Sequence, residues 1–227
     1  MHLFAALVLP RDVLDLVTQL AAGVKPEPVA TRPDRTGLSG RHLASTGKRF
    51  GRRRDHEPAR APGTGPLLDL VPPVQMHLPL AKFGHLALVE ATRLTDTMEV
   101  EAASWASPRL HLHGGVALEP KGDNSVWVGL EGDLDALNAI ARGVNDVAQG
   151  LQLFVDRRVF RPAVRLGTIN DRTTEAHLEE LLAALEAFES PAWWQTSVSL
   201  LIPADFGPDR PPYRVHRSIK LGPAVAH

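Results

Sequence analysis

Apolar residues along this chain recur at two spacings, one typical of strands and one typical of helices. Short apolar or alternating runs predict strands at residues 2–9, 76–83, 109–112, 116–118, 126–130, 159–169, 195–202 and 213–221. Apolar residues three and four positions apart predict helices over residues 11–22, 88–104, 133–149 and 173–188. Asp133 is the expected N-cap of the third helix, and Thr173 or Thr174 that of the fourth.

The order of these elements indicates the fold class. Strands interleave with helices, but several connections are hairpin-like, which favours an α+β fold over a doubly wound sheet. A strand followed by a helix occurs at residues 76–104 and again at residues 159–188. We therefore expect one domain over residues 1–227, built from two roughly duplicated halves.

Residues 31–66 depart from this pattern. They contain six Gly and four Pro with almost no apolar periodicity, so they bury too little to offset the entropy of ordering and are expected to form a long loop or disordered insert. They carry nine Lys/Arg and three Asp/Glu, a net charge of +6, whereas the remaining residues carry −7. Such a basic segment can bind nucleic acid through its phosphates. It can equally be a solvated tether that rests on the acidic body.

Composition excludes several kinds of chemistry. The 227 residues include no cysteine, which removes disulfides, thiolate nucleophiles and cysteine zinc sites and fits a reducing cytoplasm. No apolar run reaches the roughly 18 residues that a membrane span needs, so we expect no membrane contact. His111 and His113 share a strand face without a third ligand in suitable spacing, so we predict no metal site. No cofactor is expected either, because Gly47-Lys48-Arg49 lacks the rest of a phosphate loop.

Two segments carry candidate chemistry, each with proline before or within a short strand. Residues 71–84 read VPPVQMHLPLAKFG and residues 160–167 read FRPAVRLG. They resemble the two signatures of the two-histidine phosphoesterases, the 2'-5' RNA ligase and RNA 2',3'-cyclic phosphodiesterase family, in which His-x-Thr-x lies on a strand. The opening strand, the strand at 126–130 and the final hairpin are similar to that family as well.

The resemblance implies a fold and a mechanism. The expected fold has two pseudo-symmetric lobes, each an antiparallel sheet with helices, around a central cleft, and it requires no metal. Two histidines divide proton removal and proton donation when a 2',3'-cyclic phosphate is opened by water. The Thr two residues further along each strand points to the same face and can hold a phosphate oxygen.

The signatures of this chain depart from the family pattern. His77 matches the first histidine, but Pro79 replaces the first Thr, and Ala163 and Arg165 replace the second His and Thr. We take His77 as the candidate catalytic residue. Arg165 could bind a phosphate, or it could fill the vacated site and pair with an acid. The candidate ligand-binding residues are Arg165, Lys82, Pro79 and Ala163. Period-two alternation places on the cleft face His77, Pro79 and Ala81 from the first strand, and Ala163, Arg165 and Gly167 from the second.

Three functions stay open on the sequence alone. The first is a catalytically impaired family member that binds a nucleotide, an RNA end or another phosphorylated ligand in the cleft. The second is an active phosphodiesterase that uses His77 with Arg165. The third is an interaction scaffold without a small-molecule ligand.

Overall fold

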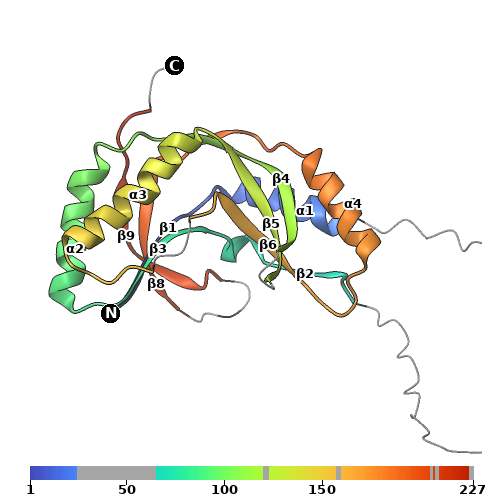
Figure 1. Ribbon diagram of the computed structural model, residues 1–227, viewed down its shortest axis with the longest axis horizontal. Helices are drawn as coiled ribbons and strands as arrows, with labels where there is room; N and C mark the ends of the chain where they lie inside the picture. The colour runs from blue at the N-terminus through green and yellow to red at the C-terminus, as the bar shows by residue number, and fades with distance from the viewer. Residues whose placement is uncertain (25–64, 120–122, 157–159, 205–206, 208–209, 225–227) are drawn as a thin grey trace, which may run out of the picture.

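The chain forms two antiparallel sheets in a computed structural model (Figure 1), which describes all residues except 25–64, 120–122, 157–159, 205–206, 208–209 and 225–227. Sheet A has the strand order β3 (Leu78–His85), β1 (His2–Leu7), β8 (Ser197–Pro203) and β9 (Tyr213–Lys220). Sheet B has the order β2 (Leu68–Leu70), β6 (Ala163–Ile169), β5 (Asp123–Gly132), β4 (Arg109–Glu119) and β7 (Trp193–Trp194). The prediction of an α+β fold with antiparallel sheets is confirmed.

Two helices cover each sheet. α2 (Leu88–Ala102) contacts β9 and α3 (Leu134–Gly150) contacts β3, so both lie on sheet A. α4 (Glu175–Glu186) contacts β4, and α1 (Arg11–Gly23) contacts α4, so both lie beside sheet B. The apolar stripes of these helices enter one core with residues of both sheets, as their helical spacing requires. A single 3₁₀ turn, η1 (Pro73–Gln75), precedes His77.

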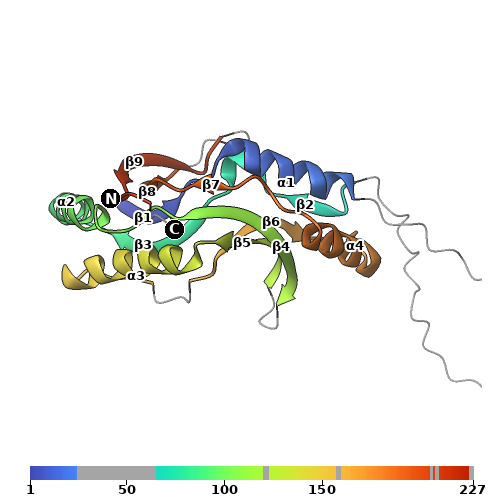
Figure 2. The same cartoon turned by 90° about the horizontal axis from the view of Figure 1, so that it is seen from above.

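The two halves of the chain share a series of elements and exchange parts. The shared series is β1, α1, β3, α2 and β4 in the first half and β5, α3, β6, α4 and β8 in the second, with β2, η1, β7 and β9 as additional elements. β1 and β3 pair in sheet A, while β5 and β6 pair in sheet B. The last strand of each shared series crosses to the other sheet, because β4 pairs with β5 and β8 pairs with β1. The duplication expected from the sequence therefore appears as two interlocked lobes, seen from above in Figure 2.

Local structure merges two of the expected strands and corrects one expected helix cap. The strands expected at 109–112 and 116–118 are one strand, β4, which continues through Gly114 at a φ of 69° with a register shift before Gly115. Glycine tolerates that backbone conformation, so the strand bends there without ending. Thr174 caps α4 by accepting a hydrogen bond from the His177 amide at 3.2 Å, as predicted. Asp133 precedes α3 but makes no side-chain cap, because its Oδ2 accepts from the Arg109 amide at 2.8 Å.

The predicted insert at 31–66 lies outside the described residues except for its end. There the Pro66 carbonyl accepts hydrogen bonds from Arg172 Nε at 3.0 Å and Asn170 Nδ2 at 3.3 Å. These bonds attach the end of the segment to the turn before α4. Within the described part of the chain, no helix has the length and apolar character needed to cross a membrane.

Candidate functional site

Both strands that carry the candidate motifs contain a bulge at the same motif position. In β3, Ala81 lies opposite Ala5 and Pro79 opposite Ala6, so Leu80 is the extra residue. In β6, Gly167 lies opposite Val126 and Arg165 opposite Trp127, so Leu166 is the extra residue. Each bulge follows the third position of a motif, at His77-Leu78-Pro79 and at Ala163-Val164-Arg165. The two motifs thus keep equivalent backbones although their side chains differ.

The bulges change which residues face away from the core. Leu80 and Ala81 are both buried, and so are Leu166 and Gly167, because a bulge turns two successive side chains to one side. The sequence-based placement of Ala81 and Gly167 on the cleft face is therefore wrong, since strict alternation fails at an inserted residue. Lys82 and Thr168 take their places. We use the name motif face for the outward-facing positions of the two motifs, which lie on different sheets. These positions are His77, Pro79 and Lys82 in the first half and Ala163, Arg165 and Thr168 in the second.

Short connectors tie the two motif strands together, although β3 and β6 belong to different sheets and do not pair with each other. The Val71 amide, in the connector before the first motif, donates to the Leu166 carbonyl of β6 at 2.9 Å. The Asp156 amide, in the connector before the second motif, donates to the Lys82 carbonyl of β3 at 3.1 Å. The connector that precedes each motif is thus hydrogen-bonded to the strand of the other motif.

His77 is held in one tautomer. Its Nδ1 lies 3.0 Å from the Gln75 carbonyl oxygen, which can only accept, so Nδ1 carries the proton and Nε2 of the neutral ring is unprotonated. Burial lowers the pKa of His77, the Gln75 carbonyl partly opposes this shift, and the positive charge of Lys82 lowers it further. The ring is therefore neutral near pH 7, a state that accepts a proton and does not donate one from Nε2.

Aromatic side chains surround His77 on sheet A. Its ring centroid lies 5.6 Å from that of Phe4 and 5.3 Å from that of Tyr213. Ala6, Leu201 and Tyr213, with Phe4 against them, form an apolar cluster separate from the main core. Sequence reasoning did not single out Phe4 or Tyr213, although both lie in predicted strands. The missing signal was the register between those strands, which brings the two rings to the motif face.

The charged group of the second motif on the motif face is the guanidinium of Arg165. Arg165 is exposed, and its guanidinium donates to Thr168 Oγ1. In the described part of the chain Arg165 forms no ion pair, so the side chain does not pair with an acid there. Ala163 lies opposite Gly129, where a Cβ would come within 2.6 Å of the His113 carbonyl oxygen. The backbone therefore requires glycine beside Ala163, which leaves the motif face open at this point.

The two histidines of β4 in sheet B, His111 and His113, lie near glutamate side chains. His111 Nε2 is 3.7 Å from a carboxylate oxygen of Glu131 and 3.8 Å from one of Glu189. His113 Nδ1 lies 2.9 Å from the Phe188 carbonyl, which with nearby glutamates raises the pKa of His113. Among the described residues no three His, Asp or Glu side chains are placed to hold a metal ion.

Comparison with known proteins agrees with this geometry at the level of the fold. No model of a protein family matches the chain, and no curated protein matches its sequence. The chain shares its fold with E. coli LigT and with a protein described as a phosphoesterase, so the expected fold is confirmed.

Three solved structures show this similarity. TT0787 of Thermus thermophilus superposes with a TM-score of 0.60 at 17% identity, covering 97% of this chain and 98% of that one. E. coli LigT complexed with 3'-AMP gives a TM-score of 0.60 at 16% identity and covers 97% of each chain. A third protein, described as a phosphoesterase, gives 0.57 at 16% identity, with 97% of this chain and 98% of that one covered.

Proposed function

We propose that this protein binds a nucleotide or RNA end through its phosphate on the motif face and is impaired as a phosphodiesterase. The observation that carries the proposal is the equivalent placement of the two motifs, each on a bulged strand of the same fold. LigT, which shares the fold, has been crystallised with 3'-AMP, with phosphate and with ATP. Those complexes support a nucleotide or a phosphate group as the ligand.

The motif face offers suitable groups for such a ligand. Lys82 and Arg165 are exposed cations, one from each motif strand, and a guanidinium can bind two phosphate oxygens at once. Thr168 adds a hydroxyl beside Arg165. The half-buried ring of Phe4 lies beside His77, and an aromatic ring of this kind can stack on a base of any sequence.

Catalytic impairment follows from the groups that are missing. Opening a 2',3'-cyclic phosphate needs one group to deprotonate water and another to protonate the leaving oxygen. His77 can accept the first proton through Nε2, which supports a second candidate function, weak phosphodiesterase activity. Ala163 supplies neither role, and Arg165 is a permanent cation that stabilises charge but cannot act as a base.

Two further parts of the proposal concern the rest of the molecule. The basic residues of 31–66 are proposed to contribute to RNA binding by neutralising phosphates. The absence of cysteine suits a reducing compartment, and we propose the cytoplasm.

Titration with 3'-AMP and with adenosine, measured calorimetrically, tests the proposal. We expect 3'-AMP to bind and adenosine to bind much more weakly, because the phosphate meets Lys82 and Arg165. A charge-assisted hydrogen bond contributes about 1.5–3 kcal/mol, so Arg165→Ala should weaken 3'-AMP by roughly 10- to 100-fold. Arg142→Ala, an exposed cation on α3, is the matched control and should change little. Equal affinity of the Arg165 and Arg142 variants, or no binding of 3'-AMP, would favour a scaffold without a ligand.

A further inference from the structure

An aromatic side chain lies beside the second motif on the outward face of sheet B. Trp127 of β5 is paired with Arg165 of β6 on one side and with Val116 of β4 on the other. Cross-strand partners share a face of the sheet, so these three side chains form one row that faces away from the core. Trp127 is half-buried, whereas Arg165 is exposed and Val116 is 51% exposed.

The side chains next to Trp127 leave room above this row. The guanidinium of Arg165 donates to Thr168 Oγ1, so it extends along β6 toward Thr168 and not across the indole. In the next row along the strands, Ala163 lies opposite Gly129. Neither residue has a side chain that reaches over its neighbours. The surface around Trp127 is therefore low, with a cation at one side.

The main core does not account for the indole. Among the residues that the structure describes, Trp105 and Trp193 pack against this core, and Trp127 is not one of its members. Packing on its cross-strand neighbours gives Trp127 a structural role. A β-branched residue such as Val or Thr serves that role in a sheet as well. The large aromatic ring at this position indicates a second role.

Phe4 of the first half is the alternative aromatic platform, because it is paired with the exposed Lys82. Its ring already packs with two others, since its centroid lies 5.6 Å from that of His77 and 6.3 Å from that of Tyr213. Trp127 offers a larger ring beside a guanidinium, which can bind two phosphate oxygens at once. The second half therefore has the better arrangement for a base next to a phosphate.

We propose that Trp127 stacks on the base of the nucleotide whose phosphate Arg165 binds. The inference rests on the proposed function and deepens it, because it assigns the base to sheet B and names the residue that contributes to its affinity. Paired residues of neighbouring strands have Cα atoms about 5 Å apart. This spacing suits a mononucleotide, in which one sugar separates the phosphate from the base.

Calorimetric titration of the full chain with 3'-AMP and with inorganic phosphate as its competitor tests the inference. We expect 3'-AMP to bind at least about tenfold more tightly than phosphate, because a stacked base adds to the phosphate contact. Trp127→Leu should weaken 3'-AMP by about fivefold or more, as expected for the loss of one stacking contact. It should change phosphate affinity much less, whereas Arg165→Ala should weaken both ligands.

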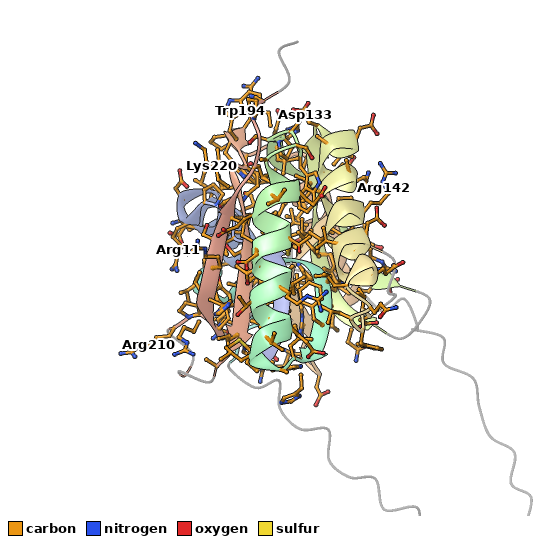
Figure 3. The ribbon with its side chains drawn as sticks, turned by 90° about the vertical axis from the view of Figure 1, so that its left-hand side faces the viewer. Arg11, Asp133, Arg142, Trp194, Arg210 and Lys220 are labelled. Atoms are coloured by element: carbon orange, nitrogen blue, oxygen red, sulfur yellow. The ribbon has the colours of Figure 1, made fainter. Side chains whose placement is uncertain are left out.

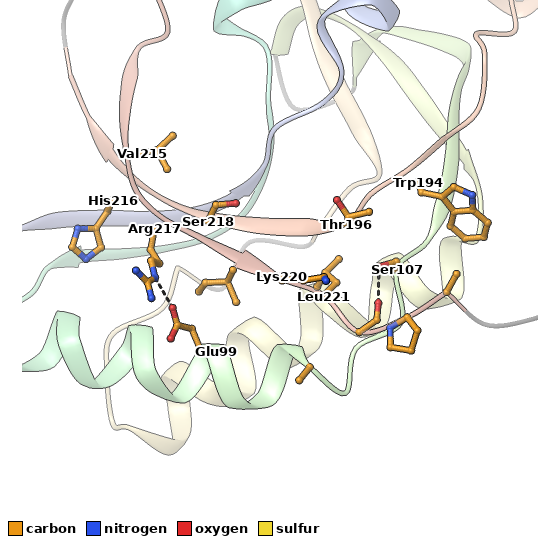
Figure 4. Close-up of a pocket in the computed structure, with 15 residues that line it drawn as sticks. Glu99, Ser107, Trp194, Thr196, Val215, His216, Arg217, Ser218, Lys220 and Leu221 are labelled. Carbon is orange, nitrogen blue, oxygen red and sulfur yellow. Dashed lines mark hydrogen bonds and ion pairs between the residues drawn. The ribbon is translucent and has the colours of Figure 1, made fainter.

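The matched control is Trp194→Leu, which should leave both affinities unchanged. Trp194 is 45% exposed and lies near the top of Figure 3. It lines a groove of about 1090 Å³ between β9 and α2 (Figure 4), and none of the described residues that line this groove belongs to either motif. Its partner on β4 is Arg109, roughly 20 Å along the strand from Val116.

Equal effects of Trp127→Leu and Trp194→Leu on 3'-AMP would overturn the inference. A similar loss of phosphate affinity in Trp127→Leu would do the same, because it would indicate a structural role. If Phe4→Leu weakens 3'-AMP more than Trp127→Leu does, the base lies on sheet A and the inference is wrong. If neither 3'-AMP nor phosphate binds, the proposed function itself fails.

Indole fluorescence gives a second measurement, which is needed if thermal unfolding shows that Trp127→Leu does not fold. A base stacked on Trp127 should quench its fluorescence when 3'-AMP is added. The quenching should disappear in Trp127→Phe, in which the phenyl ring keeps most of the packing and of the affinity, and persist in Trp194→Phe. Quenching that persists in Trp127→Phe would count against the assignment.

Discussion

Restoring the second motif should create or greatly increase phosphodiesterase activity. The change is Ala163→His together with Arg165→Thr. Ala163 is half-buried on the motif face opposite a glycine, so an imidazole has room to project. His77 already offers an unprotonated Nε2, and the new histidine would supply the missing proton donor. A positioned acid or base contributes on the order of 10²–10⁴-fold. We therefore expect kcat/KM for 2',3'-cyclic AMP to rise at least about 100-fold.

Steady-state hydrolysis of 2',3'-cyclic nucleotides measures this effect. Each single substitution should increase the rate less than the pair does, because groups that act together are not additive. His77→Ala in the restored background is the blank and should abolish the gain. The reasoning is refuted if the natural protein turns over rapidly and loses that activity with His77→Ala. In that case Arg165 would replace the missing histidine, and the chain would be an active enzyme.

Three further predictions concern stability and the basic segment. Within the part of the chain that the structure describes, Nδ1 of the buried His177 has no hydrogen-bond partner, and burial lowers the pKa of this histidine. The folded state should therefore lose stability as the pH falls below the unfolded pKa of about 6.5. Urea unfolding at about pH 7.5 and about pH 5 should show a smaller loss of stability for His177→Leu than for the natural protein. Gly143→Ala should destabilise by about 1–3 kcal/mol, because the new Cβ would lie 2.6 Å from the Trp105 ring. A Cβ at Gly150 would have no atom within 4 Å, so Gly150→Ala should be neutral or stabilise the protein by up to about 1 kcal/mol. Equal changes in the melting temperature of the Gly143 and Gly150 variants would contradict this prediction. Deleting residues 31–64 should leave cooperative unfolding intact and flatten the salt dependence of any RNA binding; an unchanged salt slope would exclude an RNA role for the segment.

The helices and most strands of this protein could be predicted from local patterns. The apolar stripe of α3 and the Thr174 cap of α4 appear in the structure as expected. These features depend on residues a few positions apart, so the chain specifies them without reference to distant segments. His77 was also proposed as a site residue in this way, since its motif is contiguous.

The composition of the motif face was decided only by tertiary structure. The bulges at Leu80 and Leu166 arise from pairing with β1 and β5, strands far away in the sequence, and they exchange Ala81 and Gly167 for Lys82 and Thr168. Alternation along a strand predicts which side chains share a face only while each residue pairs with one residue of the neighbouring strand. A bulge breaks this one-to-one pairing, and no local sequence pattern reliably marks where it occurs. The chain therefore specified its elements locally, whereas long-range pairing determined which side chains of the two motifs face outward.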